Sequence, residues 1–171
     1  MIAQNIQDAL NRQINAELYS AYLYMSMSAY FQSQNLSGFA HWMEIQAMEE
    51  FTHAKKFYDF LVERGGRIVL NGIDQPPTEW KSPEDVFTAV YTHEQKVTSL
   101  IDDLVDLAIG ARDHATNTML QWFVTEQVEE EANASEILGQ LKLIGGSGNG
   151  IFMMDRELSQ RVFTPPAVTA T

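Results

Sequence analysis

The sequence predicts an all-α protein, a bundle of four long helices with a long crossover between helices two and three and a short fifth helix. Three observations predict it: apolar residues recur at helical spacing over four long stretches, the breaks within each pair of stretches are short, and a long connection joins the pairs. The chain has 171 residues, of which 45% are hydrophobic, and can bury a sizeable core. We therefore expect one domain over residues 1–171.

Helices one and two are predicted by their apolar periodicity. In helix one, Ile6, Leu10 and Ile14 repeat every four positions, and we expect the bundle to begin near residue 4. A second helical pattern runs from about residue 37 to residue 64. Only the short break Asn35-Leu36 separates the two patterns, so these helices should form an antiparallel hairpin.

Helix three has a clear start signal. Ser82 can cap the helix, Pro83 suits its first position, and Glu84 and Asp85 place acids in its first turn. This helix is expected to run to about residue 108, where the run 110–113 breaks the pattern. Helix four then follows to about residue 144 and completes a second antiparallel hairpin.

The connection between helices two and three is long. It has roughly eighteen residues and can stretch to about 60 Å at 3.3 Å per residue, whereas a helix of 28 residues is only about 42 Å long. Gly65, Gly66, Pro76 and Pro77 lie within it. The connection can therefore cross the whole bundle and leave helices two and three parallel.

The glycine-rich run 145–150 predicts a flexible joint after helix four. A short amphipathic fifth helix is expected at about 151–162, followed by a tail over 163–171. A helix this short is not stable alone, so it must dock on its own bundle or on a neighbouring chain.

Charge and composition exclude several classes of function. The formal charge is −12, from 11 basic and 23 acidic residues, which disfavours nucleic acid and anionic membranes as partners. The absence of cysteine excludes disulfides, thiolate-bound zinc and a cysteine nucleophile. The uncharged stretch 18–40 is interrupted by polar residues and glycine, so we expect no membrane span. No secretory signal is recognisable at the N-terminus, which favours a cytoplasmic location.

One polar pattern occurs in both predicted hairpins. Its members are Glu17, Glu50 and His53 in the first hairpin, and Glu94, Gln127 and Glu130 in the second. In each hairpin the outer two members are centred on the predicted turn, at residue 35 and at residue 112. The last two members are three positions apart and share a helix face, so all six side chains can meet in the middle of the bundle.

Four glutamates at one level of an apolar bundle require cations, because each buried carboxylate without a partner costs several kcal/mol. Two divalent ions would neutralise them. Oxygen-rich ligation with one imidazole suits iron or manganese better than magnesium, calcium or zinc. The alternative is a Glu-x-x-His motif that arises by chance on a solvated face. That would explain one motif, whereas a doubled pattern around both turns favours a dinuclear metal site.

The runs Glu49–His53 and Gln127–Glu130, with Glu17 and Glu94, resemble the non-haem ferritins of prokaryotic type, within the ferritin-like di-iron carboxylate proteins. The resemblance extends from about residue 6 to residue 162. It implies an iron-storage protein with ferroxidase activity, which oxidises Fe(II) with O₂ and deposits ferric mineral. It also implies a homo-oligomeric hollow shell, expected to have 24 subunits.

The resemblance further implies two irons per subunit and no haem. The implied ligands are Glu17, Glu50 and His53 for one iron, with Glu50 bridging, Glu94 and Glu130 for the second, and Gln127 as a hydrogen-bonding partner. Bacterioferritins have a haem-binding methionine where this chain has Thr52. Rubrerythrins need cysteine ligands that this chain lacks, and its acidity gives no support for the DNA binding of miniferritins.

Other residues extend the candidate site. Glu49, Glu126 and Glu129 resemble the acids that hold an additional iron in prokaryotic ferritins, although an acidic solvated face is the alternative. Tyr24 follows Glu17 by two helical turns on the same face, so its hydroxyl could approach the metal ligands or donate electrons. The alternative for Tyr24 is a packed side chain with a satisfied hydroxyl.

Helix one is apolar nearly all round between Leu18 and Phe31, which predicts a second buried contact and hence oligomerisation. Core packing is expected for Trp122, and structural or surface roles are expected for His41, His93 and His114. Two other functions stay open at this point: an oxygenase or peroxidase on the same di-iron bundle, and a non-catalytic helical scaffold whose acids buffer metal.

Overall fold

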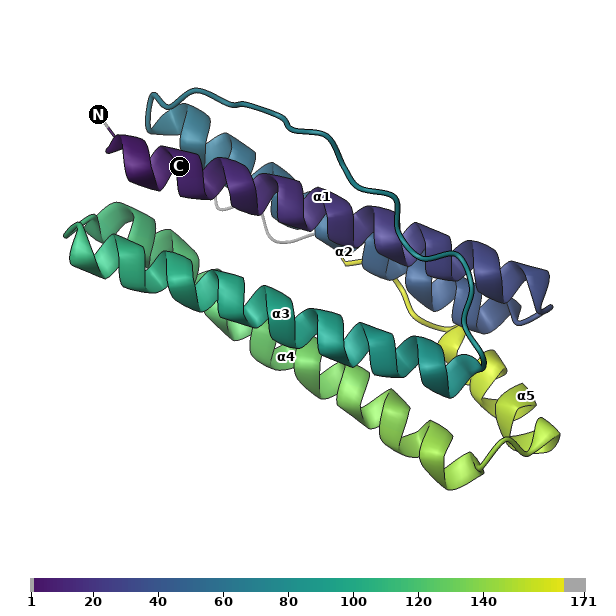
Figure 1. Ribbon diagram of the computed structural model, residues 1–171. Helices are drawn as coiled ribbons and strands as arrows, with labels where there is room; N and C mark the ends of the chain where they lie inside the picture. Colours follow the sequence, from purple (N-terminus) through teal and green to yellow (C-terminus); the bar gives the residue numbers. More distant parts are fainter. Residues whose placement is uncertain (1, 165–171) are drawn as a thin grey trace. The chain divides into compact units, whose positions relative to one another are not determined.

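The computed structural model describes residues 2–164 and contains five helices, with no strand among those residues (Figure 1). They are α1 (Gln4–Ser33), α2 (Ser37–Glu63), α3 (Pro83–Gly110), α4 (His114–Ile144) and α5 (Gly148–Leu158). The all-α prediction is confirmed, and the four long helices begin at residue 4 and end at residue 144 as expected. The described chain divides into two compact units, residues 11–79 with 148–164, and residues 2–10 with 80–147.

In the first unit, α1 and α2 form the predicted antiparallel hairpin (Figure 1). The rings of Phe31 and Phe39 stack across the turn with centroids 5.0 Å apart. About one turn further along, the Ser28 hydroxyl donates to Glu44 Oε1 at 3.2 Å. Asn35 takes the left-handed conformation, with φ 59°, that lets the chain reverse in three residues. The predicted turn position is confirmed.

The crossover after α2 lies along α1. Near its start, Asn11 Nδ2 donates to the Arg67 carbonyl at 2.9 Å, and Asn11 Oδ1 accepts from the Val69 amide at 2.8 Å. Near its end, the Ser26 hydroxyl donates to the Pro77 carbonyl at 2.6 Å. These anchors stand fifteen positions apart on α1, so the extended segment runs beside this helix over about 22 Å.

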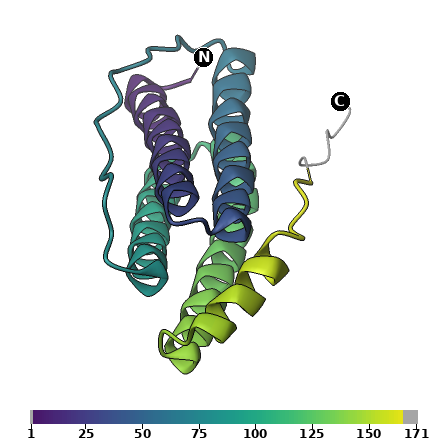
Figure 2. The ribbon, with the colours of Figure 1, turned by 90° about the vertical axis from the view of Figure 1, so that its right-hand side faces the viewer.

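Helix α5 packs against the start of α2 in the same unit (Figure 2). The N-cap position of α2 is Leu36, whose side chain cannot accept a hydrogen bond. Asp155 supplies the missing acceptor, because its Oδ1 receives the backbone N–H of Gly38 at 2.8 Å and of Phe39 at 3.0 Å. A Cβ on Gly38 would lie 1.6 Å from the Asp155 carbonyl oxygen, so only glycine permits this approach.

The predicted bounds of the fifth helix were wrong at both ends. Helix α5 spans Gly148–Leu158 rather than 151–162, and the joint is confined to residues 145–147. Positive φ angles at Gly145 (57°) and Gly146 (77°) make the break, while the later glycines enter the helix that docks on α2. Residues 159–164 continue without helix, and the predicted tail from 165 to 171 lies outside the described residues.

The second unit contains the α3–α4 hairpin. The predicted start of α3 is confirmed, since Ser82 Oγ accepts from the Asp85 amide at 3.1 Å. In the turn between the helices, Arg112 has φ 55° and Asp113 Oδ1 accepts from the Thr116 amide at 3.1 Å. The chain therefore reverses where the break was predicted.

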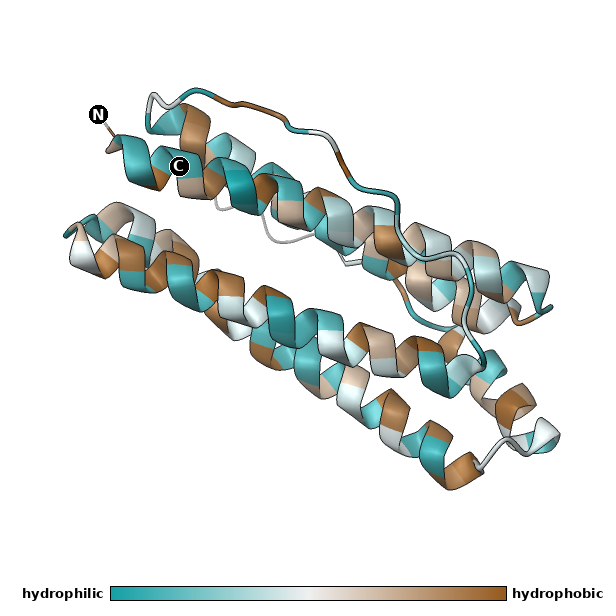
Figure 3. Cartoon of the chain, in the orientation of Figure 1, coloured by the Kyte–Doolittle hydropathy of each residue, from teal (hydrophilic) through white to brown (hydrophobic). Residues whose placement is uncertain are grey.

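Hydrophobic and hydrophilic residues alternate along every helix, as expected for amphipathic helices (Figure 3). Within residues 2–164, no helix combines the length and the apolarity needed to cross a membrane.

Replacing Gly38 with alanine tests the contact between α2 and α5. The new methyl group would force the Asp155 backbone away, so Gly38→Ala should lower the free energy of unfolding by about 1–3 kcal/mol. Gly139→Ala is the matched control because nothing lies within 4 Å of its added Cβ, and it should stabilise α4 by about 0.5–1 kcal/mol. Urea unfolding followed by circular dichroism measures both. Equal stabilisation by the two variants would contradict the close contact.

Candidate metal centre

The α1–α2 hairpin brings together Glu17, Glu50 and His53. Their exposed fractions are 1%, 2% and 3%, and one possible ligand atom from each lies within 4.8 Å of the others. Glu50 Oε2 is 3.4 Å from His53 Nδ1. The helix register explains this meeting, because Glu50 and His53 share a face of α2 and Glu17 lies across the turn at the same level. The first half of the predicted site is thus a compact buried cluster.

Two glutamines that the sequence analysis missed hold these carboxylates. Gln13 Nε2 donates to Glu17 Oε1 at 2.8 Å, and Gln46 Nε2 donates to Glu50 Oε1 at 3.2 Å. Both amides are buried, and each precedes its glutamate by four residues on the same helix. The spacing Gln-x-x-x-Glu, present in α1 and again in α2, is a sequence signal that could have found them.

The second oxygen of Glu17, Oε2, is buried and has no hydrogen-bond partner. Burial and the neighbouring Glu50 carboxylate raise the pKa of Glu17 from 4.5 to about 8, against smaller opposing effects of His53 and Gln13. A bare carboxylate oxygen in an apolar interior is costly unless a proton or a cation meets it. With a second carboxylate and an imidazole beside it, this donor set fits a divalent iron ion.

The α3–α4 hairpin buries the other three members of the polar pattern. Glu94, Gln127 and Glu130 are 2%, 4% and 5% exposed. Gln127 Nε2 lies 3.3 Å from Glu94 Oε2, from the Glu94 carbonyl and from Thr98 Oγ1. The amide at position 127 thus donates to Glu94.

The three acids expected at an additional iron have different surroundings. Glu49 is half-buried and forms an ion pair with Arg161, which the sequence analysis did not single out. Glu126 is half-buried, whereas Glu129 is exposed. Glu49 belongs to the first unit and the other two to the second.

The remaining candidates are mostly packed. Tyr24 is completely buried on α1. Trp122 meets Phe123 edge to face at 4.8 Å, in keeping with the expected packing role. Burial, with Lys96 nearby, lowers the pKa of His93 to about 4, so this imidazole is neutral at neutral pH. His41 Nε2 lies 2.8 Å from the Arg161 carbonyl.

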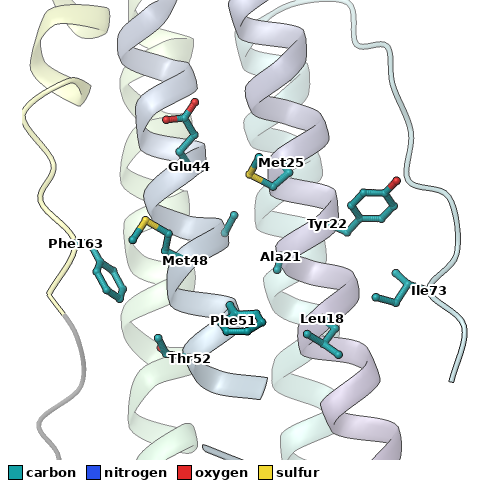
Figure 4. Close-up of a pocket in the computed structure, with 11 residues that line it drawn as sticks. Leu18, Ala21, Tyr22, Met25, Glu44, Met48, Phe51, Thr52, Ile73 and Phe163 are labelled. Carbon is teal, nitrogen blue, oxygen red and sulfur yellow. The ribbon is translucent and has the colours of Figure 1, made fainter. Parts of the chain in front are cut away.

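An apolar groove of about 590 Å³ lies over α1 and α2 (Figure 4). Ile73 of the crossover borders it on one side and Phe163 on the other. Its floor includes exposed large side chains, namely Tyr22, Met25, Met48 and Phe51. Their exposure agrees with the expectation that helix one has a second apolar contact. Thr52 also lines this groove.

Comparisons with known proteins agree on one family. The family described as "Ferritin-like domain" matches residues 7–144. The "Bacterial non-heme ferritin" of Bacteroides fragilis (strain YCH46) is 47% identical over 161 residues, covering 94% of this chain and 100% of the relative. The protein of the same name in Escherichia coli O157:H7 is 37% identical, with 93% and 96% covered.

Solved structures also match over nearly the whole chain. An Archaeoglobus fulgidus ferritin engineered into a closed form has 51% sequence identity and a TM-score of 0.95, covering 96% of this chain and 100% of that one. An open pore ferritin from the same archaeon has 51% identity and a TM-score of 0.94, with 95% and 100% covered.

The raised pKa of Glu17 predicts how the metal-free protein responds to pH. Between pH 4.5 and about 8, folded Glu17 keeps a proton that it releases on unfolding. The folded state therefore loses stability as pH rises through this window, by about 1.4 kcal/mol per pH unit. Glu17→Gln has no such proton, so its stability relative to the unchanged chain should rise across the same window. Urea unfolding at several pH values measures this difference, and a constant difference would contradict the shift.

Proposed function

Because the chain belongs to the ferritin-like family, as a non-haem ferritin, we propose that it stores iron by oxidising Fe(II) with O₂ at a di-iron centre within each subunit. The ferric product is then deposited as a mineral inside a hollow shell. The observation that carries this proposal is the buried cluster of Glu17, Glu50 and His53, in which one carboxylate oxygen has no partner. Iron is the substrate and the cargo of the protein.

Each helix hairpin supplies one half of the proposed centre. Glu17, Glu50 and His53 bind one Fe(II), and Glu50 bridges to the second. Glu94 and Glu130 bind the second Fe(II), while Gln127 donates a hydrogen bond to Glu94. Support comes from the burial of all six side chains and from the matched spacing in both hairpins. The four glutamates carry four negative charges, which two Fe(II) ions neutralise.

The protein contributes position and charge compensation to the oxidation. The two Fe(II) ions supply one electron each to O₂, which takes up two protons from the solvent and leaves as H₂O₂, so that two Fe(III) ions remain. Gln13 and Gln46 fix one oxygen of Glu17 and of Glu50, which leaves the other oxygens for metal. Glu17 gives up its proton when the cation binds, because the cation replaces the proton as its partner. Tyr24, buried on the same helix face, is the proposed electron donor or hydrogen-bonding partner beside this centre.

A third iron is part of the proposal, held by Glu49, Glu126 and Glu129. The partial exposure of Glu126 and the exposure of Glu129 suit a site at which ions exchange with the solvent. At Glu49 an incoming cation would compete with Arg161, so this site is expected to bind iron more weakly than the di-iron centre.

We propose a homo-oligomeric shell of 24 subunits. In this shell, the residues that line the groove over α1 and α2 pack against the same residues of a second copy. The exposed apolar side chains of this groove support such a contact. A cytoplasmic location and the absence of nucleic acid and membrane partners remain predictions from the sequence.

Rapid mixing of metal-free protein with Fe(II) in air tests the proposed oxidation. At two Fe(II) per subunit, the unchanged chain should show a fast phase of ferric absorbance. Glu17→Ala, His53→Ala and Glu130→Ala should each slow this phase on the order of tenfold or more, because each removes a ligand. Glu136→Ala, an exposed acid on α4, is the charge-matched control and should oxidise Fe(II) at the original rate. An unchanged fast phase in Glu130→Ala would exclude a centre shared by both hairpins.

A charge in the groove tests the proposed contact between subunits. Phe51 is 60% exposed in the single chain, so Phe51→Glu should leave the helices folded. It should nevertheless disfavour the assembly, because the contact would bury an unpaired carboxylate. Light scattering after size-exclusion chromatography should show a smaller particle, with helix content checked by circular dichroism. A particle of unchanged size would place the contact elsewhere.

A further inference from the structure

The segment after α5 lies beside α2 and carries Arg161, a residue to which the proposed function gives no role in oxidation (Figure 4). Its Nη1 donates to Gln46 Oε1 at 2.7 Å and its Nη2 forms an ion pair with Glu49. The guanidinium also stacks over the Trp42 ring, with the centre of the group 4.4 Å from the ring centroid. Since the side chain is only 19% exposed, these contacts hold it in one place on α2.

The contact with Gln46 decides which way that amide faces. A guanidinium can only donate hydrogen bonds, so the Gln46 atom opposite Arg161 must be the carbonyl oxygen. The amide nitrogen then lies on the other side, where it donates to Glu50 Oε1 at 3.2 Å. The reverse orientation would place the amide oxygen against the Glu50 carboxylate, two acceptors without a proton between them.

The fixed amide in turn orients Glu50. Glu50 Oε1 accepts a hydrogen bond from Gln46 Nε2, and Glu50 Oε2 lies 3.4 Å from His53 Nδ1. Gln46 is fully buried, so little room is left for the amide to adjust. A continuous chain of contacts therefore runs from Arg161 through Gln46 to a carboxylate of the metal cluster.

The ion pair with Glu49 has a second effect on the same helix. Glu49 and Glu50 are adjacent in sequence, and two neighbouring carboxylates disfavour each other's charge. Arg161 compensates the charge of Glu49 beside this proposed ligand.

We propose that Arg161 is a positioning residue of the metal centre, which orients Glu50 through the amide of Gln46 while it compensates the charge of Glu49. This inference rests on the proposed function, because the orientation of Glu50 matters only where Glu50 binds metal. The segment after α5 thus takes part in metal binding without contacting the metal.

Titration of the metal-free protein with Co(II) tests the proposal without iron oxidation. The visible absorption of bound Co(II) reports its ligand geometry, and the band of the cluster is the one that Glu17→Gln removes. Arg161→Gln should lower the Co(II) affinity of this band about tenfold and change its shape, as outer hydrogen-bonding partners of metal ligands commonly do. Arg156→Gln removes the same charge from an exposed site on α5 and should leave the titration unchanged.

Arg161→Lys separates charge from geometry. One ammonium group lacks the fork that reaches both Gln46 and Glu49, so this variant should bind Co(II) with intermediate affinity. Circular dichroism checks that Arg161→Gln is folded. If it is not folded, Arg161→Lys still tests the proposal. Full Co(II) affinity and an unchanged band in Arg161→Lys would overturn the orienting role.

A double-mutant cycle with Gln46→Met identifies the route. Methionine keeps the length of the side chain but removes both amide contacts, so Arg161→Gln should cause a clearly smaller loss of Co(II) affinity in this background than in the unchanged chain, because only the compensation of Glu49 is left to lose. Equal losses in both backgrounds would show that Arg161 acts through its charge alone and would overturn the proposal.

No Co(II) band in the unchanged chain would overturn the proposed metal centre itself. If the unchanged chain shows a normal Co(II) band, and both Arg161→Gln and Arg156→Gln leave it intact, only the role of Arg161 would be overturned.

Discussion

The burial of carboxylates inside a helical protein is the constraint on which the rest of this structure depends. Glu17 and Glu50 lie in an apolar interior, where an unpaired charge costs several kcal/mol. The surrounding sequence meets part of this cost with buried amides, Gln13 and Gln46, each donating to one carboxylate oxygen. These amides leave Glu17 Oε2 without a hydrogen-bond donor, and this oxygen is therefore available to bind a cation. A stable core requires every buried carboxylate oxygen to have a hydrogen-bond partner, whereas a metal centre requires some of these oxygens to be left for the metal. The candidate site consists of the oxygens that the protein does not hydrogen-bond.

Much of the fold could be predicted because its determinants are local. Apolar periodicity, the Ser82-Pro83 start signal and the short breaks locate the four long helices to within a few residues. The polar pattern was equally accessible, because residues equidistant from a tight turn must meet in an antiparallel hairpin. Residue spacing alone therefore brings Glu17 and His53 to one level, and the buried cluster confirms that they meet. The metal-binding roles of the individual residues stay predictions.

The sequence was least informative where contacts join distant segments. Glycines suggested a joint over 145–150, but α5 already begins at Gly148. The partners of Arg161 on α2 are separated from it by 112 to 120 residues, and no periodicity reports such a pairing. Gln13 and Gln46 could have been predicted more easily, since each lies one helical turn before its glutamate. They were missed because an amide on a helix has many roles, and only burial shows which one applies.

The capping of α2 by Asp155 has a consequence for how the chain is made. Synthesis proceeds from the N-terminus, and 117 residues separate this acceptor from the Gly38 amide that it receives. While the ribosome extends the rest of the chain, α1 and α2 can pair, but the first turn of α2 must expose its amides to water. The hairpin is finished only when the last helix emerges. A nascent or prematurely terminated chain therefore carries a frayed helix end next to apolar surface, which is the kind of feature that chaperones and proteases recognise in incomplete proteins.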